Sequence, residues 1–441
     1  MKFFIYKFAN KIFRIFIFFS VYLYFFFKKK HNKYCVQDVN TYGDSIIFYD
    51  LIRLKNINNK KKYIPIVPNY NLTLSIVRIF FKENEYLVYR QYIYLFLIFI
   101  LNLYYFLIKK KNGSLLIDLN HILIVELKKR IHRKYNQNVS FYSIYDPAKD
   151  INLIKNKSFF SKSFLKSYIS TRKVNNIFPQ LKEYFHLRSK FGPLRVNFYD
   201  SETLLENLKI TKKYVCLFIR PYPDRGIYSF KKNFETDPRA NYDLNSFSNT
   251  INFLIKKDYQ IILMGNFNNK FINNKIFKKC VNYRNSIYQN PKNDFIITQN
   301  CDFAIVSQGG YVVVPPVLGI PTLAINNVYL AGFYDYKKIM YHPKYFITNK
   351  IKYLKLRDIM KLPIFFEFSK ELFNSYGIVT KDINSKDLLL SVKNFCFMVK
   401  KNDFSNKSNK INLLKKYLNP LHLRLNSCFK SLMPNYLDKN F

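Results

Sequence analysis

The sequence predicts an α/β fold with a doubly wound parallel sheet in its C-terminal half. Short apolar segments of strand length recur there, and segments with helical periodicity lie between them. Three of the ten glycines in the chain fall within residues 301–326, where they separate two of the apolar segments. The predicted strands of this half are Tyr214–Arg220, Tyr259–Met264, Phe303–Val306 and Thr322–Ile325.

The predicted helices of the same half follow a 3.6-residue apolar period. Asp243 is expected to cap a helix whose apolar stripe runs from Leu244 to Ile255, and a second amphipathic helix is expected over Asp387–Val399. The adjacent glycines Gly309 and Gly310 predict a tight turn with the N-terminus of a helix behind it. Backbone N–H groups in such a turn can approach a phosphate closely.

The N-terminal half is predicted to form a second α/β domain. A turn at 41–45 leads into a helix over Ile46–Leu54, and a strand over Tyr63–Val67 follows. Further helical patterns cover Leu72–Phe81 and Leu119–Tyr135. We therefore divide the 441 residues into a basic apolar segment (1–35), an N-terminal α/β domain (36–205), a C-terminal α/β domain (206–400) and a basic tail (401–441).

The first 35 residues are expected to bind an anionic membrane surface. They hold eight basic residues and no acidic one, and the apolar run Ile15–Phe27 ends at three lysines. As a helix this run spans about 20 Å, which is shorter than the bilayer core, so a shallow anchor is expected. A second apolar run, Tyr92–Ile108, lies at the lower limit for a membrane span and also fits a buried helix.

The formal net charge of +44 favours polyanionic partners. Nucleic acid is not the expected one, because no recognition motif for DNA or RNA occurs. The six cysteines contain no C-x-x-C pair and the six histidines show no metal-binding spacing, so no zinc site is expected. Widely spaced cysteines fit a reducing compartment.

Ligands of open parallel sheets bind beyond the carboxyl ends of the strands. Arg220 ends one predicted strand and could form a bidentate contact with a diphosphate. Gly265 and Asn266 end the next strand, and Asn326 follows the last. The turn after the predicted strand Phe303–Val306 offers the polar groups of Ser307, Gln308, Gly309 and Gly310.

No D-x-D sequence occurs, so no paired carboxylates are expected to hold a divalent ion on a diphosphate. We predict neutralisation by arginine, lysine and the N-termini of helices, including the helix behind the glycine turn, with no metal and no cofactor beyond the substrate.

Two stretches, 214–266 and 295–326, resemble a family of bacterial glycosyltransferases of surface-polysaccharide synthesis, with a weaker match over Ile378–Phe395. The family's strand ending in V-C-L-x-x-R is matched at 215–220, and its loop arginine and acidic residue are matched approximately by Arg239 and Asp243. The strand ending in Met-Gly is matched at 264–265. The residues that match the closing run are Cys301, Phe303, Ser307, Gly309 or Gly310, Val314, Pro315, Gly319, Pro321, Leu323 and Asn326.

The resemblance implies a GT-B-like architecture, in which two Rossmann-like domains face a cleft and the C-terminal one binds a nucleotide-sugar. It implies transfer of a sugar to a growing surface glycan, free or lipid-linked, at the cytoplasmic face of the bacterial inner membrane. The family often has a histidine two residues before the strand-end arginine, where this chain has Phe218.

Asp44 is the candidate general base. Gly43-Asp44 is similar to the Gly-Asp turn of heptosyltransferases, and a carboxylate there could take a proton from the acceptor hydroxyl. The alternative is that Asp44 only caps a helix. Two other functions stay open: a nucleotide-sugar epimerase of the same fold, and a non-enzymatic basic protein that binds membranes or nucleic acid through a degenerate transferase core.

Overall fold

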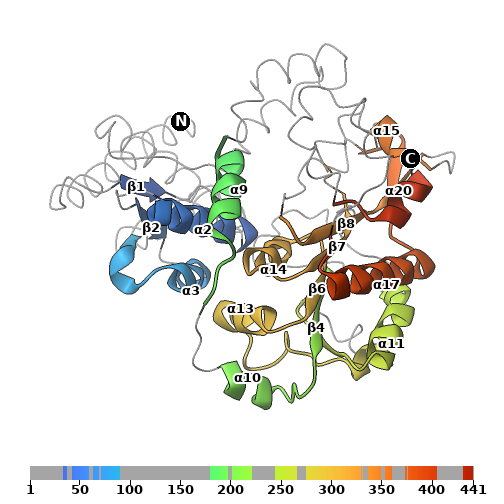
Figure 1. Cartoon of the computed structure of the whole chain (residues 1–441), viewed down its shortest axis with the longest axis horizontal. Helices are drawn as coiled ribbons and strands as arrows, with labels where there is room; N and C mark the ends of the chain where they lie inside the picture. The colour runs from blue at the N-terminus through green and yellow to red at the C-terminus, as the bar shows by residue number, and fades with distance from the viewer. Residues whose placement is uncertain are drawn as a thin grey trace, which may run out of the picture. The chain divides into compact units, whose positions relative to one another are not determined.

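The computed structural model divides the chain into two compact units, coloured along the chain in Figure 1. Unit 1 comprises residues 1–159 and 175–191, and unit 2 comprises 160–174 and 192–441. The described residues are 33–36, 42–58, 63–68, 71–89, 179–196, 201–220, 244–265, 275–328, 330, 336–348, 353–359, 373–374, 376–404 and 431–440.

Several predicted features lie outside these residues. They are the two apolar runs Ile15–Phe27 and Tyr92–Ile108, the helical pattern Leu119–Tyr135, and the residues Arg239, Asp243 and Asn266. Among the helices in the described ranges, none combines the length and the apolar character that a membrane crossing requires.

Unit 1 is built on a parallel three-stranded sheet in the order β1-β2-β3. Its elements are β1 (Lys33–Val36), α2 (Tyr42–Asn58), β2 (Tyr63–Pro68), α3 (Asn71–Phe80), η1 (Glu83–Glu85), β3 (Leu87–Tyr89) and α9 (Pro179–Phe191). Helix α2 packs against both α3 and α9. Its residues from Ile46 to Ile52 are all buried, so the helix forms the centre of the core of this unit.

Unit 2 contains a five-stranded parallel sheet in the order β5-β4-β6-β7-β8. Its strands are β4 (Tyr214–Phe218), β5 (Gln260–Leu263), β6 (Phe303–Ser307), β7 (Thr322–Asn327) and β8 (Ile339–Pro343), with β9 (Tyr345–Thr348) and β10 (Ile378–Lys381) forming a separate antiparallel pair. Its helices are α10 (Ser201–Asn207), η4 (Leu244–Phe247), α11 (Ser248–Lys256), η5 (Phe277–Lys279), α13 (Pro291–Gln299), η6 (Gly310–Val313), α14 (Val314–Val317), α15 (Leu356–Ile359), α17 (Ser385–Lys401) and α20 (Pro434–Asn440).

Single bridges extend the large sheet at both edges. Val281 pairs in parallel with Ile262 of β5, and Leu432 pairs in parallel with Tyr341 of β8. With the Val281 bridge counted as a minimal third strand, the order in chain sequence becomes 3-2-1-4-5-6. This is the strand order of the doubly wound dinucleotide-binding fold.

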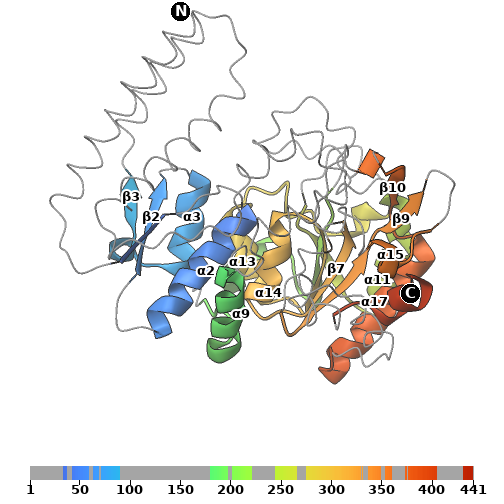
Figure 2. The ribbon, with the colours of Figure 1, turned by 90° about the horizontal axis from the view of Figure 1, so that it is seen from above.

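Helices cover both faces of this sheet: α13 and α14 lie on one side, and α11 and α17 on the other, in both Figure 1 and Figure 2. Alternation of side chains along each strand explains the two contacts. The Tyr214 hydroxyl donates to the Ile297 carbonyl of α13 at 2.8 Å, whereas the Phe303 ring meets the Phe395 ring of α17 at 5.7 Å. The predicted α/β class with a parallel sheet is thus confirmed.

The segment behind the glycine turn differs from its prediction. Instead of a regular helix it contains one 3-10 turn, η6, and the four-residue helix α14. Pro315 and Pro316 have no N–H to donate, which removes two of the hydrogen bonds that would extend a helix. The dipole of such a short helix adds little to an anion site, so any phosphate there depends on the turn itself.

Candidate functional site

The candidate site lies at the carboxyl ends of β4 and β6, where the direction of strand addition reverses. Strand β4 has β5, the next strand along the chain, on one side. The chain then crosses to the other side of β4, where β6 pairs with it. The connections leaving β4 and β6 therefore diverge, and this reversal point is where open α/β sheets bind ligands.

Arg220 and Ser307 meet at this point. The Arg220 backbone N–H donates to the Ser307 hydroxyl oxygen at 2.7 Å, and Ser307 is fully buried. The Ser307 side chain therefore fixes the backbone from which Arg220 projects. Arg220 is half-buried, so its stem packs on protein at the edge of the sheet.

Gly309 lies against the same residues. A Cβ added to it would stand 4.0 Å from Cδ of Arg220 and 2.9 Å from Cε1 of Phe218. Its φ of 177° is ordinary extended backbone, so the glycine serves close approach and not an unusual backbone angle. Phe218 in turn packs on Tyr311, with ring centroids 5.2 Å apart. The Phe218 ring, which packs on Tyr311, is thus the side chain that lies against the turn at Gly309.

Two amide side chains tie the neighbouring strand ends together. The Gln308 side-chain oxygen accepts a hydrogen bond from the Val328 N–H at 2.8 Å, which links the end of β6 to the end of β7. The Asn326 oxygen accepts from the Ile383 N–H at 3.0 Å, and Asn326 has a left-handed φ of 54°. Both predicted ligand residues therefore hold backbone in place through the oxygen of the amide.

The remaining predicted residues are placed as follows. Gly265 is buried two residues after the end of β5. The residue between them, Met264, donates its N–H to the Leu217 carbonyl of β4 at 2.9 Å. Asp44 is the third residue of α2, so it lies in the first turn of that helix rather than at its cap. Arg239 and Asn266 fall outside the described residues.

Sequence reasoning missed a buried ion pair beside the β8 end. Lys344 is fully buried, and its Nζ lies 2.6 Å from Oδ1 of Asp382, which is itself almost fully buried. The Lys344 N–H also donates to the Asn327 carbonyl at 3.1 Å. The sequence around these two residues does not indicate that they pair, because the aspartate follows the lysine by 38 positions. Within the described ranges, no three His, Cys, Asp or Glu side chains gather as a metal site would require.

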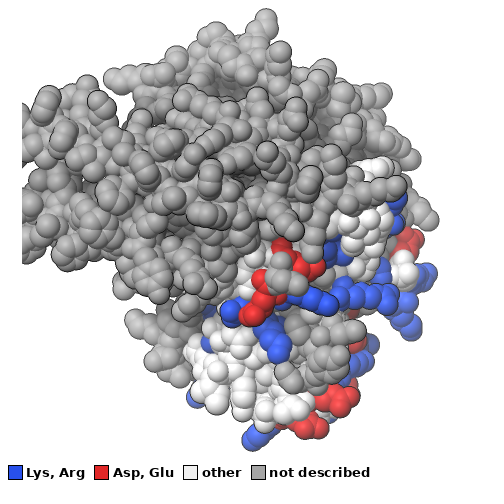
Figure 3. All heavy atoms as spheres, turned by 90° about the vertical axis from the view of Figure 1, so that its left-hand side faces the viewer, with Lys and Arg blue, Asp and Glu red and all other residues white. Residues whose placement is uncertain are grey.

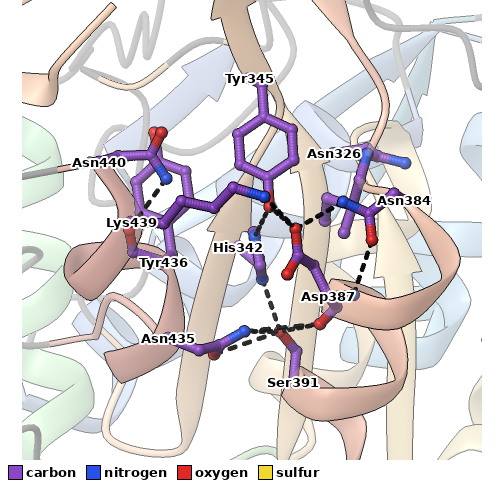
Figure 4. A network of polar contacts seen from close by, with 11 residues as sticks. Asn326, His342, Tyr345, Asn384, Asp387, Ser391, Asn435, Tyr436, Lys439 and Asn440 are labelled. Atoms are coloured by element: carbon purple, nitrogen blue, oxygen red, sulfur yellow. Dashed lines mark hydrogen bonds and ion pairs between the residues drawn. The ribbon is translucent and has the colours of Figure 1, made fainter. Parts of the chain in front are cut away.

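A second polar cluster, shown in Figure 4, joins β8, α17 and α20. His342 Nδ1 lies 2.5 Å from the Ser391 hydroxyl, and the Tyr345 hydroxyl donates to Asp387 at 2.6 Å. Lys439 of α20 also contacts Asp387 at 2.6 Å. Burial lowers the pKa of His342 to about 3, so the imidazole is neutral at physiological pH.

This cluster does not have the exposure that a nucleophilic site needs, because His342 and Ser391 are both fully buried. The pKa of Asp387 is lowered although partial burial acts to raise it, since Lys439, Tyr345 and Asn384 all donate to the carboxylate. The cluster is therefore a structural junction that holds the last helix on the sheet.

No family model matches the chain, and no curated protein does either. Among solved structures, the chain is similar to the ADP-heptose lipopolysaccharide heptosyltransferase II of E. coli, at 11% identity over 66% of this chain and 84% of that one, with a TM-score of 0.37. It is similar to heptosyltransferase WaaC of E. coli with ADP-2-deoxy-2-fluoro heptose, at 10% identity over 67% and 89%, with a TM-score of 0.35. It is also similar to a family 9 glycosyl transferase of Veillonella parvula, at 9% identity over 84% and 98%, with a TM-score of 0.45. Superpositions this loose do not bear on the activity of this chain.

Proposed function

We propose that this protein is a glycosyltransferase that binds the diphosphate of a nucleotide-sugar at the carboxyl ends of β4 and β6. The observation that carries the proposal is the junction of Arg220, Ser307 and Gly309 at the reversal point of the sheet. An arginine that follows a strand, beside a glycine turn, can supply both a guanidinium and backbone N–H groups to one anion.

Arg220 is the residue proposed to neutralise the negative charge of the donor diphosphate. When the bond between the sugar carbon and the diphosphate oxygen breaks, negative charge grows on the leaving nucleoside diphosphate. A guanidinium held beside it stabilises that charge without a metal ion. Gly309 and Gly310 are proposed to offer backbone N–H groups to the phosphates, while Gly265 is proposed to let the nucleoside approach the end of β5. Arg239, Asn266 and Asn326 are the further proposed donor contacts.

Asp44 of unit 1 is proposed as the general base. It would take the proton from the acceptor hydroxyl as the oxygen attacks the sugar carbon. In the GT-B-like architecture that the sequence resemblance implies, unit 1 is proposed to bind the acceptor and unit 2 the donor.

The proposed acceptor is a growing surface glycan, free or carried on a lipid. The basic residues of the first 35 positions would hold the enzyme on the anionic cytoplasmic face of the bacterial inner membrane.

Donor binding by the full chain tests the proposal. UDP-, GDP- and dTDP-linked sugars, which carry a diphosphate, are titrated into the wild type by calorimetry, and a CMP-linked sugar, which carries one phosphate, is titrated for comparison. Arg220→Ala is expected to lower the affinity for the donor that binds by at least about tenfold. Arg220→Lys is expected to lower this affinity too, because lysine lacks the planar guanidinium that contacts two phosphate oxygens. Arg195→Ala removes an exposed arginine of the same unit and is the matched control.

Failure of every donor to bind the folded protein would refute the proposal. Exchange of a sugar hydrogen with solvent, in the absence of any acceptor, would instead identify an epimerase that uses the same donor site.

A further inference from the structure

One face of α17 is exposed along its whole length, and we propose that it docks on an anionic membrane surface. The face consists of six side chains, which we call the α17 face: Lys386, Leu390, Lys393, Phe397, Lys400 and Lys401. At about 100° per residue these positions fall within one stripe of the helix. The buried residues of α17 lie on the opposite side: Leu388, Ser391, Val392 and Phe395.

The two large apolar residues of this face keep much of their surface exposed. Leu390 is 43% exposed and Phe397 is 58% exposed, although each would be favoured in a core. They lie seven positions apart and so two turns apart on the same side of the helix. A helix that only needed solubility would carry polar residues at these central positions.

Lysines surround the two apolar residues. Lys401 Nζ lies 4.4 Å from the centroid of the Phe397 ring, and Lys393 Nζ lies 5.7 Å from the Phe253 ring of α11. Lysine stems can lie along apolar surface while the ammonium groups reach lipid phosphates. This arrangement, with apolar residues at the centre and lysines at the rim, is that of helices that lie in a bilayer interface.

The charge of the face has one sign. Helix α17 has four lysines and one acid, Asp387, and that carboxylate is engaged by Lys439 and Tyr345. By contrast, the described residues on the face shown in Figure 3 include Lys and Arg mixed with Asp and Glu.

An anionic bilayer fits the α17 face better than a nucleic acid does. Both would attract the lysines through their charge. Leu390 decides between them, because an aliphatic side chain has no stacking surface for bases but gains from entry into the acyl region.

The absence of tryptophan from the sequence allows a direct test. Phe397→Trp in the full chain places one fluorophore at the centre of the face. Vesicles of phosphatidylcholine with phosphatidylserine are expected to shift its emission to the blue, and brominated acyl chains are expected to quench it at least about twofold. Ile287→Trp is the matched control, because Ile287 is 92% exposed in the segment that leads into α13, outside the α17 face; its emission should not change.

A charge-matched pair tests the lysines. Lys393→Glu with Lys400→Glu is expected to lower vesicle binding at least about tenfold. Lys278→Glu with Lys279→Glu makes the same change in net charge at exposed positions of η5 and is expected to have a much smaller effect.

Four outcomes would overturn the proposal. The first two are no binding to vesicles at all, and binding without any response of the tryptophan introduced at position 397. The third is a response of that tryptophan to RNA and not to vesicles. The fourth is a concentration-dependent blue shift without lipid, which would indicate a face between two copies of the chain. A donor-binding defect in these variants is not expected, so this test is independent of the proposed transferase activity.

Discussion

Gly309 and Phe218 fit together so closely that no side chain can be added to the glycine without moving the ring. A Cβ on Gly309 would lie 2.9 Å from Cε1 and 3.2 Å from Cζ of Phe218. The ring cannot move freely, because it packs on the Tyr311 ring, which is buried. The turn at the end of β6 is thus shaped by an aromatic residue from the neighbouring strand.

Gly309→Ala is expected to destabilise the protein by about 1–3 kcal/mol, the usual cost of overpacking. Phe218→Ala should relieve the clash, so the double variant is expected to be more stable than the sum of the two single effects. Urea unfolding of the four proteins gives the coupling energy. Strict additivity would mean that the ring and the glycine do not constrain each other.

Ser307→Ala is expected to release the Arg220 backbone. Its hydroxyl is the acceptor for the Arg220 N–H at 2.7 Å. Loss of that partner leaves a partly buried donor without its bond, at a cost of about 1–3 kcal/mol. Hydrogen exchange should show faster exchange of the Arg220 amide. Ser286→Ala is the control. It removes a hydroxyl that donates to the Tyr283 carbonyl in another turn, and it is expected to leave the exchange rate of the Arg220 amide unchanged.

The strands of the candidate site could be predicted because their signals are local. Each predicted apolar run of four to seven residues corresponds to a strand, although β4 ends at Phe218 and β5 at Leu263, two residues before Arg220 and Gly265. The predicted helix over 243–255 was less regular: it is a 3-10 turn followed by α11. The alternation of strands and helices was enough for a parallel sheet, and the sheet order then brought Arg220 next to Ser307.

Contacts between distant residues left no such signal. Asp50 is joined to residues of α9 that lie 134 and 138 positions away. Helix α20 ends a stretch that the sequence marks only as a basic tail, yet Tyr436 and Leu437 are buried. A single sequence shows periodicity along one element but not which elements meet, so these partners could not be predicted.

Asp50 is expected to be the most important polar residue of unit 1. Its buried carboxylate accepts from Arg53 at 2.6 Å, from Arg188 at 3.0 Å and from Tyr184 at 2.9 Å. Asp50→Asn leaves two guanidinium groups, one of them buried, without a counter-charge. Removal of one partner from a buried pair costs about 3–5 kcal/mol. The unfolding transition of unit 1 should therefore move to a lower urea concentration.

The control for that change is Asp258→Asn. Asp258 contacts Lys212 at 2.6 Å, a distance like that of the Asp50 pair, but both side chains are exposed. Solvent screens such pairs, so no measurable change in stability is expected. Equal effects of the two substitutions would show that burial does not set the strength of these ion pairs.

His342 is expected to make stability fall as the pH drops below about 7. Burial lowers its pKa to about 3, whereas in the unfolded chain the pKa is about 6.5. Between these two values the unfolded chain binds a proton that the folded protein does not, so the stabilisation present above pH 6.5 is lost progressively toward pH 3. The loss at pH 5 is about 2 kcal/mol for one such group.

Replacement of the imidazole isolates this effect. Asp387 and Lys439 face the cluster, but the lowered pKa of Asp387 confines its own effect to more acidic pH. His342→Gln should therefore flatten the dependence of the unfolding free energy on pH between about 7.5 and about 5. His186→Gln, at an exposed position, should leave the slope as it is. A wild-type slope that survives the His342 change would place the responsible proton elsewhere in the protein.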